Sequence, residues 1–470
     1  MEFSQYDDND NVSLTKFESM LKTNNVLFFD SNEFETIIQH YLELGKIALA
    51  KKAIKMGLEQ HPTRVNLKLF QVEIYVLEDK LQQADKLLDA LYVIEPSNEE
   101  IYIQKASILS KRDEHDKAID TLKIALTLSD NDEDEADLYA MIGMEYLFMD
   151  QFENAKEYFI KCLELDMEDY SALYNIIYCF DFLNLTDDAI EFLNQYLDNN
   201  PYCEVAWHQL GRQYYILKDY KKALAAFDFA IISDDSFVGA YLEKGKVLEK
   251  LKQYEEAIEN YNVTLALDEP TSYALLRIGN CYEKLKQTDL AVHYYYKTVH
   301  EDPLLDKGWI AITRYYVRQK NYQKGLYYIN KAINIDVDNV HYWKLYAQIN
   351  HRLNFLEEAE RGYKKALDLG NYELSTWLSR ADILISLGEY EASALNLIQA
   401  AEFYPETADI EYRLAGIYYT LLEPEKGQYH LKNGLLLDAE SDFIMEELFP
   451  LIASQKKVQD FISSSKKSSK

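Results

Sequence analysis

Small residues recur along this chain at an almost constant spacing, and this spacing constrains the fold more than any other feature. Alanine, glycine or serine stands at twelve places, and successive places are 34 residues apart except for one step of 37. A large apolar side chain follows four residues after each, a spacing that places both on one face of a helix. The small residues are Ala50, Ala84, Ala118, Ala155, Ala189, Ala223, Ala257, Ala291, Gly325, Ala359, Ser393 and Gly427.

Each 34-residue unit has the pattern of two helices joined by a short polar turn. Tyr, Phe or Leu stands nine residues before the small residue in eleven of the twelve units. A small residue lets two helices cross closely, because a bulky side chain there would push the axes apart. Apolar residues at helical spacing mark both halves of the clearest unit: Trp207, Leu210, Gly211 and Tyr214, then Ala223, Phe227 and Ala230.

Two local features refine this pattern. The 37-residue step contains three surplus residues, Glu133, Asp134 and Glu135, within the acidic run 130–137, and these predict a longer solvated loop. Ser97 and Glu100 have the spacing of a capping box that opens a helix.

Composition agrees with an all-helical chain and excludes several classes of protein. Only 15 Gly and 8 Pro occur in 470 residues, which argues against a turn-rich β-sandwich. Lys and Arg number 49 against 80 Asp and Glu, a net charge of −31, which disfavours a nucleic-acid or anionic-membrane binder. The acidic N-terminus does not resemble a signal peptide, and no run of about 18 apolar residues predicts a membrane span. We therefore expect a cytoplasmic protein whose four cysteines are reduced and mostly buried.

The repeated positions resemble those of the tetratricopeptide repeat, with its W-x2-L-G-x2-Y…A-x3-F…P pattern at 34 residues. The resemblance implies an all-α, right-handed α-solenoid superhelix of about twelve helix-turn-helix repeats. We place the repeats at 31–64, 65–98, 99–132, 136–169, 170–203, 204–237, 238–271, 272–305, 306–339, 340–373, 374–407 and 408–441. An acidic segment and capping helix are expected at 1–30, C-terminal capping helices at 442–462, and a basic disordered tail at 463–470.

Motifs of catalysis are missing from the sequence. No phosphate-binding glycine loop, G-x-S-x-G or H-E-x-x-H pattern occurs, and the cysteines lack metal-ligand spacing. We therefore expect no enzymatic activity, no cofactor and no metal site.

The resemblance implies that repeat positions 2, 5, 9, 12 and 13 face a concave groove, and two zones emerge from these positions. An apolar zone in repeats 4 and 5 contains Met144, Phe148, Tyr174, Tyr178 and Phe182. A mainly basic zone in repeats 6 to 10 contains Arg212, Lys246, Lys250, Asn280, Lys284, Arg314, Arg318, Lys344 and Arg352. The sign of this second zone opposes the net charge of the chain, so it would concentrate an acidic partner.

Each zone has an alternative explanation. The cations could pair with neighbouring acids such as Glu249 and Glu283 instead of binding a partner. The aromatic residues could fill the space between adjacent helices. The carboxylate clamp of co-chaperone repeats is not reproduced, because repeat 8 has Asn280 but Leu276 where the family has Lys.

These observations predict a non-catalytic scaffold that binds an extended, acidic peptide or protein segment in its groove. A structural subunit of a larger multiprotein assembly is the alternative, and an enzyme with an unrecognised site is a more remote one. We expect protein partners, no nucleic acid and no membrane insertion. The sequence leaves the partner's identity and the oligomeric state open.

Overall fold

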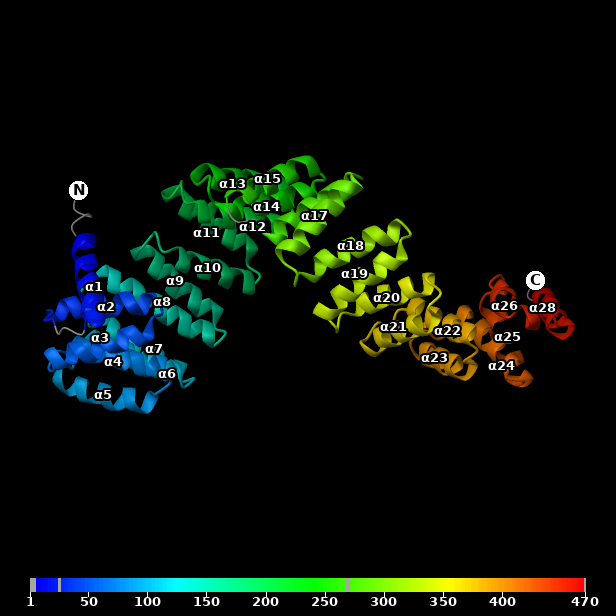
Figure 1. Cartoon of the computed structure of the whole chain (residues 1–470), viewed down its shortest axis with the longest axis horizontal. Coiled ribbons are helices and arrows are strands. Elements are labelled where there is room, and N and C mark those ends of the chain that lie inside the picture. The colour runs from blue at the N-terminus through cyan, green and yellow to red at the C-terminus, as the bar shows by residue number, and fades with distance from the viewer. Residues whose placement is uncertain (1–5, 24–26, 268–270, 469–470) are drawn as a thin grey trace. The chain divides into compact units, whose positions relative to one another are not determined.

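The computed structural model describes residues 6–23, 27–267 and 271–468, and it shows no strand in these ranges (Figure 1). Its contacts divide the chain into two compact units, residues 1–233 and 234–470. Within each unit, helices follow one another as antiparallel pairs, and each pair packs against the next pair in sequence. An array of this kind has no central core that would hold it as one body.

The first unit contains thirteen helices among its described residues. They are α1 (Tyr6–Thr23), α2 (Ser31–Glu43), α3 (Ile47–Gln60), α4 (Val65–Leu77), α5 (Leu81–Ile94), α6 (Glu99–Ser110), α7 (His115–Leu126), α8 (Asp132–Phe148), α9 (Phe152–Leu165), α10 (Tyr170–Phe182), α11 (Thr186–Asn199), α12 (Glu204–Ile216) and α13 (Tyr220–Ser233). From α2 to α25, even-numbered helices are the first of each hairpin, and odd-numbered helices are the second.

The second unit continues the same alternation of first and second helices. It contains α14 (Val238–Lys250), α15 (Tyr254–Leu267), α16 (Ser272–Lys284), α17 (Thr288–Glu301), α18 (Asp306–Arg318), α19 (Tyr322–Ile335), α20 (Val340–Arg352), α21 (Leu356–Asp368), α22 (Leu374–Leu387), α23 (Tyr390–Phe403), α24 (Ala408–Thr420), α25 (Pro424–Leu437), α26 (Phe443–Leu448), α27 (Pro450–Ala453) and α28 (Lys456–Ser468). No described helix of either unit is both long enough and apolar enough to cross a bilayer.

The small residues that define the repeat are all buried, as the spacing predicts. Each lies on a second helix, and the apolar residue four positions later is buried as well. The buried side chains form a series of local clusters along each unit. The core is therefore assembled hairpin by hairpin.

In several repeats the apolar residue of the second helix packs directly onto a glycine of the first. A Cβ at Gly143, Gly211, Gly245 or Gly279 would lie 2.9, 2.6, 2.5 or 2.5 Å from the ring of Phe159, Phe227, Tyr261 or Tyr295, respectively. In repeats 11 and 12 the same two places hold smaller pairs, Ala381 with Leu397 and Ala415 with Leu431. In repeats 4 and 6 to 8 the aromatic rings stand opposite glycine, whereas repeat 10 holds Ala347 and Tyr363 at the same two places.

The turn inside every hairpin contains one residue in the left-handed region, at position 15 of the repeat. Glycine fills this place only at Gly45 and Gly388. The other ten turns use Asp79, Asp113, Asp150, Asn184, Lys218, Lys252, Lys286, Lys320, Asn354 and Leu422, with φ between 55° and 64°. Asp and Asn tolerate this conformation, whereas Lys and Leu adopt it at a cost.

Three local expectations are wrong. Residues 133–135 do not form a loop, because α8 begins at Asp132 and these surplus residues belong to its first turn. Carboxylates in the first turn of a helix interact favourably with the positive end of the helix dipole. Helix α6 is capped by Asn98, whose side chain accepts from the Glu100 N–H at 3.1 Å, so Ser97 is not the cap. The tail expected to be disordered at 463–470 is helical through Ser468, residues 469–470 lying outside the described ranges, and Lys466 pairs with Asp442 at 2.6 Å.

The two ends of the array are covered by helices outside the repeats. Phe17 of α1 is buried against Phe29 and Phe34, with ring centroids 6.0 and 6.3 Å apart. At the other end, Phe449 lies against Gly416, and Val458 of α28 is buried in the same cluster. These contacts cover apolar surface that a terminal repeat would otherwise expose.

The glycine–ring contact predicts that an alanine at position 211 changes the free energy of unfolding in a direction that depends on the residue at position 227. Gly211→Ala should lower the free energy of unfolding by about 1 kcal/mol, since overpacking outweighs the higher helix propensity of alanine. In a Phe227→Leu background the same change should raise it, because leucine leaves room for the methyl group. Denaturant unfolding of the four proteins of this double-mutant cycle measures the coupling, and additive effects would contradict the contact.

The left-handed turns predict a stabilising substitution at an exposed residue. Leu422 is 87% exposed with φ 62°, so Leu422→Gly should raise the free energy of unfolding by about 0.5–1 kcal/mol. Gly388→Ala is the matched reverse change, because no atom lies within 4 Å of the added Cβ, and it should destabilise. Thermal unfolding that shows the opposite order would exclude turn strain as the cause.

Candidate partner-binding surfaces

The first helices carry the residues that the sequence assigns to partner binding. The apolar zone lies entirely in the first unit, on α8 and α10, and Arg212 of the basic zone also belongs to this unit, on α12. The other members of the basic zone lie in the second unit, on α14, α16, α18 and α20. The apolar zone and most of the basic zone therefore belong to different units.

The aromatic side chains of the apolar zone are largely exposed. Phe148, Tyr178 and Phe182 have exposed fractions of 57%, 51% and 57%. The Phe182 ring stacks on the buried Phe152, with centroids 3.9 Å apart, and Tyr178 lies 6.1 Å from Phe182. Since one face of Phe182 is covered while much of the side chain stays accessible, the ring is held in place without being buried.

Met144 and Tyr174 are less exposed than the other three residues of the apolar zone, although Tyr174 still has an exposed fraction of 42%. Met144 is half-buried and packs against the core cluster of repeats 4 to 6. Burial raises the pKa of Tyr174, which lies near Gln209 and Arg212. Arg212 is half-buried and donates to Gln209 at 2.9 Å, so it extends this polar edge of the apolar zone.

The basic zone of the second unit contains two kinds of cation. Lys246, Arg318 and Lys344 each form an ion pair, with Glu243 at 2.6 Å, Glu283 at 2.7 Å and Glu373 at 2.6 Å. The remaining four cations are exposed and have no ion-pair partner among the described residues. These four are Lys250, Lys284, Arg314 and Arg352.

Acidic residues link neighbouring first helices in this unit. Glu283 of α16 accepts from Arg318 of α18 and from the Tyr295 hydroxyl at 2.8 Å. Asn280 of the same helix also accepts from the Tyr295 hydroxyl, at 3.0 Å. Sequence reasoning missed Arg277, which pairs with Glu249 at 2.8 Å and connects α16 to α14. Because repeat position 6, where Arg277 stands, is not among the groove positions, no sequence signal pointed to it.

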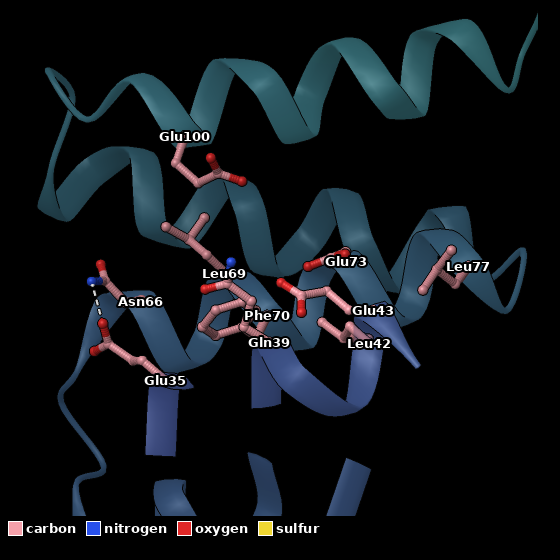
Figure 2. Close-up of a pocket in the computed structure, with 10 residues that line it drawn as sticks. All are labelled: Glu35, Gln39, Leu42, Glu43, Asn66, Leu69, Phe70, Glu73, Leu77 and Glu100. Carbon is pink, nitrogen blue, oxygen red and sulfur yellow. Dashed lines mark hydrogen bonds between the residues drawn. The ribbon is translucent and has the colours of Figure 1, made fainter. Parts of the chain in front are cut away.

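Sequence reasoning also missed a cavity between the first helices of repeats 1 to 3. It has a volume of about 710 Å³ and is lined by Glu35, Gln39, Leu42, Glu43, Asn66, Leu69, Phe70, Glu73, Leu77 and Glu100 (Figure 2). All of these except Phe70 stand at repeat positions 2, 5, 9, 12 or 13. The signal was therefore present in the same positions that gave the other two zones.

The four cysteines are free and buried, and no group of three or more metal-ligating side chains is placed to hold an ion within the described ranges. Burial raises the pKa of the Cys162 and Cys281 thiols to about 12 and that of Cys179 to about 11. The thiolate is the nucleophilic form, so these thiols are unreactive in the folded chain.

This chemistry predicts how the thiols respond to a thiol-specific reagent. Ellman's reagent near pH 8 should react with the native protein far more slowly than with glutathione, and with all four cysteines once the chain is unfolded in guanidinium. Absorbance at 412 nm follows the reaction. A native thiol that reacts as fast as glutathione would contradict the burial.

Comparison with known proteins gives matches to one repeat family. Tetratricopeptide-repeat family models match residues 136–168, 171–201, 208–270 and 273–304. Anaphase-promoting complex subunit 3 of Schizosaccharomyces pombe is 24% identical over 209 residues, which are 44% of this chain and 31% of that protein. The chain thus matches about a third of that relative's length.

Two solved structures match the chain at low similarity. The C-terminal part of a TPR repeat-containing protein from Cytophaga hutchinsonii is 17% identical, with a TM-score of 0.43 and coverage of 54% of this chain and 98% of that one. The APC/C hetero-tetramer Cut9–Hcn1 is 12% identical, with a TM-score of 0.35 and coverage of 98% and 94%. The family matches identify residues 136–168, 171–201, 208–270 and 273–304 as tetratricopeptide repeats, and small residues at the repeat spacing are buried in the rest of the array as well.

Proposed function

We propose that the chain is a non-catalytic protein-interaction scaffold whose second unit binds an extended acidic segment along its first helices. The observation that carries the proposal is the set of exposed cations without ion-pair partners among the described residues, Lys250, Lys284, Arg314 and Arg352. They stand on four successive first helices, in a chain whose net charge is −31. A row of cations along one surface attracts and orients a negatively charged partner.

The paired cations have a supporting part in this proposal. Lys246, Arg318 and Lys344 are engaged by Glu243, Glu283 and Glu373, so fewer of their donors are available to a ligand. The Arg318–Glu283 pair joins α16 to α18 and fixes the spacing between the helices that carry Lys284 and Arg314. Solvent-accessible ion pairs contribute little stability, about 0–1 kcal/mol each, but they orient the side chains of the surface.

The first unit contributes a second contact surface under the same proposal. Phe148, Tyr178 and Phe182 would take apolar side chains of a partner, since their rings are more than half exposed and Phe182 is already ordered by Phe152. An ordered aromatic ring loses little conformational freedom on binding, which favours its use in an interface.

A structural subunit of a multiprotein assembly is the second candidate function. The relative that matches 44% of the chain is named as a subunit of the anaphase-promoting complex. Large apolar side chains are also exposed on second helices, among them Val93, Ile232 and Leu436. In this alternative the second-helix surface carries the subunit contacts, and the first-helix surface does not.

A synthetic acidic peptide tests the proposed function. We expect fluorescein-labelled Glu-Ser-Leu-Glu-Ser-Leu-Glu to bind at physiological ionic strength, and the triple variant Lys250→Glu, Lys284→Glu, Arg314→Glu to weaken binding at least about tenfold because three cations are reversed. The matched control reverses three exposed lysines on second helices of the same unit, Lys331→Glu, Lys364→Glu and Lys432→Glu. Fluorescence anisotropy measures the affinities.

Equal weakening by both triple variants would show general charge attraction and would contradict the basic-surface proposal. The assembly alternative is tested with Val93→Asp, Ile232→Asp and Leu436→Asp in the native cell. If these changes abolish co-purification of other subunits while the charge-reversal triple preserves it, the second candidate is favoured over the first.

A further inference from the structure

The cavity of the first unit has a chemical character opposite to that of the basic zone. Its lining comes from three successive first helices, α2, α4 and α6, and α4 packs against both of the others. Figure 2 shows the carboxylates of Glu43, Glu73 and Glu100 directed into the space between these helices. Each helix therefore contributes at least one acidic side chain to the same concave surface.

These carboxylates are not neutralised within the described part of the chain. Glu35, at the edge of the cavity, pairs with Arg64 at 3.0 Å and accepts from Asn66 at 3.0 Å. Glu43, Glu73 and Glu100 have no cationic partner among the described residues; Glu100 accepts only from the neutral Gln104, at 2.8 Å. Burial raises the pKa of Glu73, as does the nearby Glu100 charge, and burial also raises the pKa of Glu100. A cation placed between them would lower the energy of both carboxylates.

Besides the carboxylates and the amides of Gln39 and Asn66, the lining is apolar, which distinguishes the cavity from an ordinary acidic surface. Leu69 is buried at its floor, Leu42 and Phe70 are half-buried, and Leu77 is exposed at its edge. Arg and Lys side chains combine an apolar stem with a cationic end. The combination of apolar floor and carboxylates therefore fits such side chains better than a small inorganic cation.

The helix spacing sets the spacing of cations in a ligand. Packed helices lie about 8–10 Å apart, and an extended chain advances about 3.1–3.3 Å per residue. Three residues of an extended segment thus span the distance from one first helix to the next. Successive carboxylates on α2, α4 and α6 would then meet side chains at positions i, i+3 and i+6 of the segment.

We propose that this cavity binds an extended segment of a partner protein that carries Arg or Lys at every third residue. Each cationic side chain lays its stem on Leu69 or Phe70 and donates hydrogen bonds to one of the carboxylates of Glu43, Glu73 and Glu100. This site goes beyond the proposed acidic ligand of the second unit, because it lies in the other unit and selects the opposite charge.

A peptide with the proposed spacing tests this site. Fluorescein-labelled Arg-Ser-Leu-Arg-Ser-Leu-Arg should bind the full chain at physiological ionic strength, where long-range attraction by the net charge is screened. A peptide of the same composition with its three arginines adjacent should bind at least about fivefold more weakly, because its cations cannot reach three helices. Fluorescence anisotropy compares the two.

Neutral substitutions separate the cavity from the general acidity of the chain. The triple variant Glu43→Gln, Glu73→Gln, Glu100→Gln should weaken binding at least about tenfold, since it removes the charge from three charge-assisted hydrogen bonds. The matched triple Glu59→Gln, Asp89→Asn, Asp120→Asn removes the same charge from exposed positions on the second helices of the same hairpins and should change binding less than twofold. Circular dichroism checks that both variants are folded.

A charge swap gives a gain of binding that misfolding cannot imitate. Glu43→Arg with Glu73→Arg should lose the arginine peptide and strengthen binding of the corresponding glutamate peptide. The Lys250→Glu, Lys284→Glu, Arg314→Glu background removes the second-unit surface, so any gain is assigned to the cavity. Equal weakening by the two neutral triples, or equal affinity for the two arginine peptides, would overturn this proposal and leave the acidic-ligand proposal untouched.

Discussion

The close crossing of two helices at a small residue is the interaction on which the rest of the structure depends. Ala223 on α13 lets α12 and α13 approach, and Phe227 one turn later fills the space beside Gly211. This packing recurs because the small residue and the apolar residue recur in every repeat. Each hairpin therefore has the same internal packing and presents a similar surface against which the next hairpin packs. The first helices, together with their exposed side chains, are placed as a consequence.

The repeat itself could be predicted from the sequence because its determinants are local and few. A small residue and an apolar residue four positions apart suffice to place a second helix, and the structure buries both at every repeat. The start of α8 could not be placed in the same way. A run of acids is compatible with a loop or with the first turn of a helix, and only the pairing of α8 with α9 decides between them. The same holds for the tail, which becomes helical where Lys466 meets Asp442.

The candidate sites were harder to predict because they depend on contacts between repeats. The sequence placed Lys246 and Lys250 on the same helix, but the acid that engages Lys246 cannot be told from the many others in so acidic a chain. The sequence did not predict that Arg277 connects two first helices through an ion pair with Glu249. The cavity could have been predicted, since all but one of its lining residues stand at the expected groove positions of repeats 1 to 3.

The left-handed residue of each hairpin turn has a further consequence. It lies outside the cavity lining and outside the two zones of binding residues, and at ten of twelve turns it is not glycine. Its identity changes the backbone energy of one hairpin without altering any side chain of a recognition surface. Mutation at these turns can therefore change the stability of individual repeats while leaving partner choice unchanged. Stability and recognition are thus free to evolve separately in this chain.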